Sequence, residues 1–225
     1  MENLYKYENN KEIKSYVERS FPEFNDYLLN ITFSAEIPPI LQSLIDFKSE
    51  NYDEELTEYP IDQLMGAYSH ETKSIVIYLL GIHLAAKQLK SRINVSSLYA
   101  DLLHIVLLHE IGHYWFYNVK ISKDLRFSGA DIEPIKDKKV DEWIAQMFAY
   151  FCLKENTNLT MTMSALAEHQ PEDYRFYKKY QPENIQVFKL IVRQIHLSDS
   201  ADQTYKKLIV NDIIKRYKEY CDYNL

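Results

Sequence analysis

Residues 109–113 read His-Glu-Ile-Gly-His, which is an H-E-x-x-H motif. On a helix, positions i and i+4 lie on one face, so the imidazoles of His109 and His113 can both reach one metal ion. Glu110 is rotated off that line, where its carboxylate can polarise a water molecule without binding the metal. A chain of this composition is expected to contain the motif by chance only about 0.02 times. The motif therefore predicts a metal centre with a general base beside it.

A catalytic zinc ion takes three protein ligands and keeps a fourth position open, so the two histidines need a third partner. We expect it to be Glu142, which begins a helical face continued by Ala145, Gln146 and Ala149. The small residues of this face let two helices approach closely, as a Glu ligand of limited reach requires. The amide of Gln146 could hydrogen-bond a histidine ring and fix its orientation. The rival carboxylates, none of which begins such a face, are Asp141, Asp131 and Glu133.

The other histidines are predicted to have structural or surface roles. His104 lies about 140° around the helix from His109, so it should not share the metal. A tyrosine such as Tyr117 or Tyr174 could stabilise a transition-state oxyanion, but the sequence does not choose among 19 tyrosines. Cys152 is predicted to be a small core residue. The remaining histidines are His70, His83, His169 and His196.

The motif lies inside the longest apolar stretch of the chain, from Leu102 to Tyr117. Histidines and a glutamate interrupt this stretch, which favours a buried helix over a membrane span. Ser96 and Ser97 are candidate N-caps for a long helix from Leu98 to about Tyr117. A second helix, from Val140 to Lys154, carries Glu142. These two helices must lie side by side to assemble the metal centre.

The segment from Gly66 to Tyr78 has the pattern of a β-hairpin. A polar cluster, Ser69 to Ser74, separates two short runs that are rich in aromatic and β-branched residues. This is the only good strand signal in the chain. Because the segment comes shortly before the motif helix, we expect the hairpin to border the metal cleft with one strand at the edge of the sheet.

Most of the remaining chain is predicted to be helical or irregular. Short amphipathic helices are expected over residues 8–30, and further helices over residues 40–50 and 82–90. At least two helices follow Pro171, roughly at residues 183–197 and 201–220. The acidic stretch 50–58 is read as a solvated linker, and residues 120–139 as an irregular connection.

Composition narrows the class of protein. The chain has 225 residues, enough for one sizeable core, and 26 basic against 33 acidic side chains give a net charge of 26 − 33 = −7. A negative balance argues against a general nucleic-acid binder. Only 4 glycines are present, which disfavours folds with many tight turns and favours helices.

The compartment is predicted from cysteine usage and from the N-terminal residues. Cys152 and Cys221 cannot form a disulfide framework, and free thiols indicate a reducing environment. The N-terminal residues have no apolar core of a secretory signal. We therefore expect a cytoplasmic protein with no membrane partner.

Together, H-E-I-G-H and the later E-x-x-A-Q-x-F-A resemble the zinc metallopeptidases of the gluzincin kind, most closely the ImmA/IrrE-type group. That group shows H-E-x-G-H, then a Glu followed by Ala-Asn and Phe-Ala on a second helix, with an edge strand ahead of the first. The resemblance covers about residues 64–154. It implies His109, His113 and Glu142 as zinc ligands and Glu110 as general base. Gln146 departs from the family's Asn or Asp, and neither end shows a DNA-binding helix-turn-helix.

The expected fold is therefore α+β: a predominantly helical, zincin-like domain with a small antiparallel sheet and additional C-terminal helices. Residues 1–225 are expected to form a single domain, with a core at about 64–154 and a helical extension at about 160–225. The expected function is hydrolysis of a peptide bond in a protein or peptide substrate with Zn²⁺ as cofactor.

Two other interpretations remain open. The chain could be a non-catalytic zinc-binding interaction or regulatory module, in which case a fourth protein ligand should close the site. It could also be a plain helical protein with a chance motif, which metal analysis of untagged protein would reveal.

Overall fold

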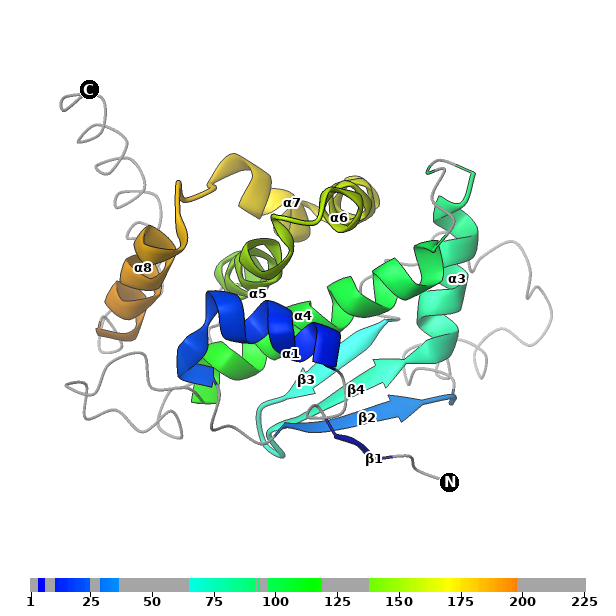
Figure 1. Cartoon of the computed structure of the whole chain (residues 1–225), viewed down its shortest axis with the longest axis horizontal. Helices are drawn as coiled ribbons and strands as arrows, with labels where there is room; N and C mark the ends of the chain where they lie inside the picture. The colour runs from blue at the N-terminus through cyan, green and yellow to red at the C-terminus, as the bar shows by residue number, and fades with distance from the viewer. Residues whose placement is uncertain are drawn as a thin grey trace.

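The computed structural model of the chain describes residues 4–6, 11–24, 29–36, 65–91, 93, 97–118 and 138–197 (Figure 1). The N-terminal elements are β1 (Leu4–Lys6), α1 (Lys11–Ser20), the 3₁₀ helix η2 (Pro22–Phe24), β2 (Asn30–Ser34), β3 (Gly66–Ser69), β4 (Ser74–Tyr78) and α3 (Leu79–Leu89). They are followed by α4 (Leu98–Asn118), α5 (Lys138–Leu153), α6 (Thr157–His169), α7 (Glu172–Lys179) and α8 (Ile185–Leu197). The predicted α+β, predominantly helical class is confirmed.

The four described strands form one sheet in the order β1-β2-β4-β3. The predicted hairpin is confirmed: β3 and β4 pair antiparallel, with Gly66 opposite Ile77 and Ser69 opposite Ser74. The sheet as a whole is mixed and not antiparallel as we predicted, because β2 pairs parallel with β4. Parallel neighbours need a long connection, and here it runs from the end of β2 to the start of β4 and includes β3. The hairpin was also not the only strand-forming segment, since β1 and β2 complete the sheet.

Helix α4 runs through the centre of the molecule (Figure 1). Every residue from Ile105 to Tyr117 is buried. One side of α4 contacts β3 and β4, and other sides contact α3, α5 and α6. A helix that is covered on all sides must be apolar around its whole circumference, which explains the long apolar run of the sequence. The prediction of a buried motif helix is confirmed.

Helix α5 covers α4 on the side away from the sheet, and α1, α6, α7 and α8 pack on α5 (Figure 1). The buried apolar side chains form one cluster that extends from Ile13 on α1 to Ile195 on α8. Within it, the ring of Phe21 stacks on that of Phe148 with centroids 4.1 Å apart. Cys152 is fully buried in this cluster as predicted, and burial raises the pKa of its thiol well above the usual value.

Most of the predicted helices that can be compared with the structure are present. The helices expected in residues 8–30, 82–90, 98–117, 140–154 and 183–197 correspond to α1 with η2, α3, α4, α5 and α8. Helices α6 and α7 lie largely within the helical extension predicted for about 160–225, but their individual bounds were not predicted. The predictions for residues 40–50, 50–58 and 201–220, and for nearly all of 120–139, lie outside the described residues. None of the helices in the described ranges has the length and apolar composition that crossing a membrane requires.

Candidate metal centre

Two histidines on α4 direct their rings to one point, as their spacing predicted. The Nε2 atoms of His109 and His113 lie 3.2 Å apart, and the ring centroids are separated by 4.8 Å. Both residues are 8% exposed, so they retain an open side although the helix is otherwise enclosed. His104 faces elsewhere, with its Nε2 3.8 Å from Glu12 on α1, which confirms that it takes no part in this pair.

Helix α5 brings Glu142 to the histidines because α4 and α5 cross at very close range. A Cβ atom placed on Gly112 would lie 2.9 Å from the Cα of Ala145 and 3.0 Å from its carbonyl oxygen. Such a crossing needs glycine on one helix and a small residue on the other. The predicted role of the small face of α5 is therefore confirmed. The Oε2 atom of Glu142 lies 3.1 Å from His109 Nε2 and 3.7 Å from His113 Nε2.

The three atoms of this triad, His109 Nε2, His113 Nε2 and Glu142 Oε2, fit one metal ion. Neighbouring ligand atoms in a tetrahedral zinc site with bonds of about 2.0–2.2 Å lie about 3.3–3.6 Å apart. The separations of 3.2, 3.1 and 3.7 Å are close to these values. Glu142 Oε2 is buried and faces both histidine nitrogens, so the three atoms converge on one point. Among the described residues, this is the group of histidines and acidic side chains that could hold a metal ion.

The second oxygen of Glu142 is held by a tyrosine from α7. The hydroxyl of Tyr174 donates a hydrogen bond of 3.0 Å to Oε1, and this contact is buried. The ring of Tyr174 lies 5.8 Å from that of His109. This hydrogen bond fixes the rotation of the carboxylate and leaves Oε2 directed at the histidines.

His113 is oriented by Asp141, which the sequence marked only as a rival carboxylate. Its Nδ1 atom lies 3.2 Å from Asp141 Oδ1, and the hydroxyl of Tyr117 donates a 3.0 Å hydrogen bond to the same oxygen. A carboxylate on the far nitrogen fixes the tautomer and the ring orientation of a metal-binding histidine. The structure joins Gln146 to neither histidine ring, and His109 Nδ1 has no hydrogen-bond partner. The prediction that Gln146 orients a histidine is wrong in this structure, because its amide lines the cavity described below.

Charges within the site act against the effect of burial. Burial lowers the pKa of His113, but the charges and hydrogen bonds of Asp141 and Glu142 outweigh it and raise that pKa well above the usual value. Burial raises the pKa of Glu142, but hydrogen bonds and charge from His109 and His113 outweigh it and lower that pKa. Glu142 is therefore a carboxylate at neutral pH, the form in which a side chain binds a metal.

Glu110 lies beside the triad but is not part of it. It is 6% exposed, and a Cβ atom on Gly66 would lie 2.9 Å from its Oε1 atom, so glycine at this point of β3 leaves room for the carboxylate. Burial raises the pKa of Glu110, and the charges of His109 and His113 oppose this shift. A raised pKa makes the carboxylate a better proton acceptor, which suits a general base.

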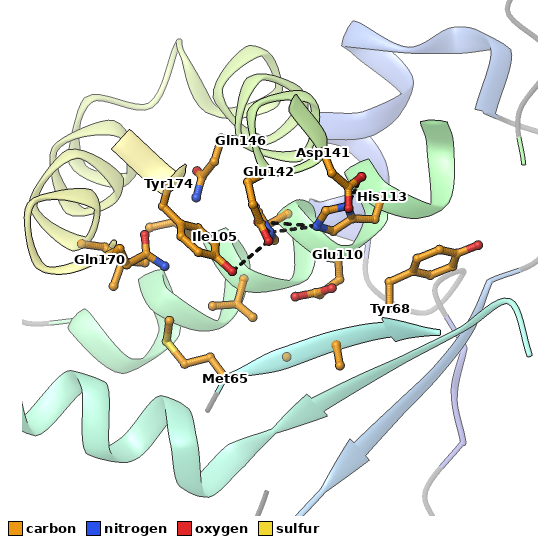
Figure 2. A pocket seen from close by; sticks show the side chains of 15 residues that line it. Met65, Tyr68, Ile105, Glu110, His113, Asp141, Glu142, Gln146, Gln170 and Tyr174 are labelled. Carbon is orange, nitrogen blue, oxygen red and sulfur yellow. Dashed lines mark hydrogen bonds and ion pairs between the residues drawn. The ribbon is translucent and has the colours of Figure 1, made fainter. Parts of the chain in front are cut away.

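A cavity of about 430 Å³ opens over the triad. Figure 2 shows Tyr68 at one end of it, Gln170 and Tyr174 at the other, and Glu110, Glu142 and His113 between them. The residues that line it are Met65, Gly66, Ala67, Tyr68, Ile105, Val106, His109, Glu110, His113, Asp141, Glu142, Gln146, Leu166, Gln170 and Tyr174. The prediction that the hairpin borders the cleft is confirmed.

Strand β3 lies at an edge of the described sheet and lines the cavity. The N–H of Tyr78 donates to the carbonyl of Met65 at 2.9 Å, so the backbone of Met65 faces β4. Alternate residues of an antiparallel strand face the same neighbour, so the backbone groups of Gly66 and Tyr68 face away from β4. These groups are placed to pair with an extended chain in the cavity.

The remaining candidates lie apart from the triad. The ring of His70 meets that of Tyr117 at 4.9 Å, His196 packs on Phe116, and His83 is exposed. Of the two tyrosines suggested for an oxyanion, only Tyr174 lines the cavity. The rival carboxylates Asp131 and Glu133 lie outside the described residues.

Comparison of the chain with protein-family models, with curated proteins and with solved structures finds no match.

Proposed function

We propose that this protein is a zinc-dependent peptidase. The observation that carries the proposal is the triangle of His109 Nε2, His113 Nε2 and Glu142 Oε2, with sides of 3.1–3.7 Å, beside a buried carboxylate that is not a ligand. The proposal agrees with the resemblance of the two motifs to the gluzincin peptidases of the ImmA/IrrE type. It does not depend on that resemblance, because the donor set and its spacing support it independently.

Zinc is the metal that this donor set favours. Two imidazoles and one carboxylate, with a fourth position open, form a ligand set used by catalytic zinc sites. A bound zinc ion supplies Lewis acidity, which polarises a scissile carbonyl and lowers the pKa of water toward about 7. Asp141 and Tyr174 hold the ligands His113 and Glu142 in place through their hydrogen bonds.

Glu110 is the proposed proton carrier. Its carboxylate accepts a proton from the attacking water and delivers it to the leaving amine. Glu110 is buried against β3, and no salt bridge joins its carboxylate to another described residue. The carboxylate therefore stays available to accept a proton. Gly66 makes this position possible by leaving space above the carboxylate.

The proposed substrate is an extended segment of a protein or peptide. The outward backbone groups of Gly66 and Tyr68 can pair with such a segment as an added strand. In strand addition the hydrogen bonds join main-chain groups of the two partners. They can therefore place a peptide bond over the triad whatever side chains the substrate carries. We propose the cytoplasm as the compartment, since Cys152 is a free, fully buried thiol.

The alternative of a zinc-holding regulatory module predicts that a fourth protein ligand closes the site. Among the described residues, three ligand atoms converge, and they line an open cavity. This arrangement favours catalysis over a purely structural role.

The experiment is a cleavage assay on a mixed peptide library, read by mass spectrometry. Zinc-loaded protein should cut a defined set of peptides, chelator-treated protein should cut none, and added zinc should restore cleavage. Zinc that binds at one ion per chain without any cleavage would support the regulatory module instead. Protein that binds no zinc would contradict both functions.

A further inference from the structure

The cavity over the triad is a single space, and we call its end away from Tyr68, where Met65, Gln170 and Tyr174 lie, the lobe (Figure 2). Its apolar walls are Met65, which directly precedes β3, Ile105 of α4 and Leu166 of α6. Two amide side chains, Gln146 and Gln170, also line this part of the cavity (Figure 2). The lobe is therefore an apolar part of the pocket whose wall carries neutral hydrogen-bonding groups.

Gln170 carries an unsatisfied polar atom. The residue follows the last turn of α6 and is 6% exposed, yet its Oε1 atom is buried without a hydrogen-bond partner. A buried carbonyl without a partner carries a desolvation cost that a donor can relieve. The two ends of an amide can exchange places by rotation, so Gln170 can present either its acceptor or its donor to a guest in the cavity.

The lobe lacks charged partners for a guest. No lysine or arginine occurs among the described residues that line the cavity, and the acidic ones belong to the triad and its surroundings. Among these acidic residues, Glu142 already accepts a hydrogen bond at Oε1 from the hydroxyl of Tyr174. A charged side chain that entered the lobe would lose its hydration without gaining a matched charge.

An added strand on β3 places a defined part of the substrate in this lobe. Antiparallel pairing is the more stable form, and β3 runs from Gly66 to Ser69. An antiparallel partner therefore runs from the Tyr68 end of the cavity to the Met65 end. The residue that follows the scissile bond is directed toward Gln170.

We propose that this lobe is a subsite for an uncharged side chain that donates a hydrogen bond, such as that of Gln, Asn or Thr, with Gln170 as its specificity-determining residue. The proposal rests on the proposed function, since it takes the triad as the point at which the substrate is anchored. It assigns a substrate preference that neither the metal ligands nor Glu110 can supply.

The test measures binding and needs no turnover. The probes are dipeptide amides Xaa-Ala whose N-terminus carries a malonyl hydroxamate, which anchors them at zinc, with Gln, Leu, Lys or Glu as Xaa. Calorimetry on zinc-loaded protein should give about 10-fold tighter binding of the Gln probe than of the Lys and Glu probes. The parent protein should also bind the Gln probe more tightly than the Leu probe. In Gln170→Leu this difference in affinity should disappear.

Gln170→Glu provides the sharper test, because a carboxylate in the lobe should make the Lys probe the tightest binder. Gln194→Glu, the same change at an exposed position on α8, is the matched control and should leave the order unchanged. Equal affinities for all four probes, failure of the probes to bind, or an unchanged order in Gln170→Glu would overturn the proposal. Selective binding by a protein that cleaves no peptide would contradict the proposed function and leave the subsite standing.

Discussion

The backbone of Gly112 on α4 lies against that of Ala145 on α5, so closely that a methyl group on the glycine would lie 2.9 Å from the Cα of Ala145. The two histidines flank Gly112 on one helix, and Glu142 lies one turn before Ala145 on the other. The crossing of these helices therefore sets the distance between the two histidines and Glu142, the three proposed metal ligands.

Gly112→Ala should lower both stability and metal affinity. Overpacking a helix crossing costs about 1–3 kcal/mol, and contact between two backbones leaves no side chain that can move aside. This cost exceeds the roughly 1 kcal/mol that alanine gains over glycine in a helix. Thermal unfolding and zinc titration measure the two effects. A variant that is more stable than the parent and binds zinc equally well would show that the crossing is not close.

Asp141→Asn should weaken zinc binding by about 10–100-fold, because the carboxylate holds the Nδ1 side of His113. A competitive titration with a fluorescent zinc chelator gives the affinity. Asp173→Asn, on α7 and 3.9 Å from Lys139, is the matched control and should bind zinc as the parent does. Equal affinities for Asp141→Asn and the control would remove the assigned role of Asp141.

Tyr174→Phe should weaken zinc binding by about 3–10-fold, because Glu142 loses the hydrogen bond that holds Oε1. Tyr177→Phe is the matched control: it is a buried tyrosine one turn further along α7 that does not line the cavity. If both substitutions change the zinc affinity equally, the effect comes from α7 as a whole and not from the hydroxyl of Tyr174.

His113→Ala should abolish stoichiometric zinc binding at sub-micromolar free metal, since two remaining ligands do not make a closed set. His104→Ala on the same helix is the control, because its ring faces Glu12 and not the triad. Elemental analysis of untagged protein after dialysis measures the zinc content. Full zinc content in His113→Ala would show that the ion binds elsewhere.

The central part of the fold and the triad could be predicted from sequence because their signals are local. The i, i+4 histidines, the apolar run around them and the small face after Glu142 each lie within one helix. The hairpin was also predictable, since both of its strands and its turn lie within residues 66–78.

Elements that depend on distant partners could not be predicted. Strand β2 is five residues long and is stabilised by parallel pairing with β4, more than 30 positions later in the chain. Helix α6 is rich in threonine, which lowers its helix propensity, although Asn156 caps its first turn by accepting from the N–H of Leu159.

The orientation of the site residues also depends on the packing of α5. Asp141 and Gln146 lie on either side of Glu142 in the sequence, and both are polar. The rotation of α5 directs the carboxylate of Asp141 to His113 and leaves the amide of Gln146 in the cavity wall. Sequence spacing identifies a shared helical face but not the angle at which that face meets its neighbour.

The most direct measurement is the rate of peptide cleavage by Glu110→Gln at full zinc occupancy. Glutamine keeps the shape of the side chain but cannot accept a proton at neutral pH, so cleavage should fall by about 10²–10⁴-fold while zinc content and unfolding temperature stay at their parental values. Glu168→Gln on the exposed surface of α6 is the matched control and should cleave at the parental rate. Cleavage by Glu110→Gln at an undiminished rate would contradict the proposed mechanism.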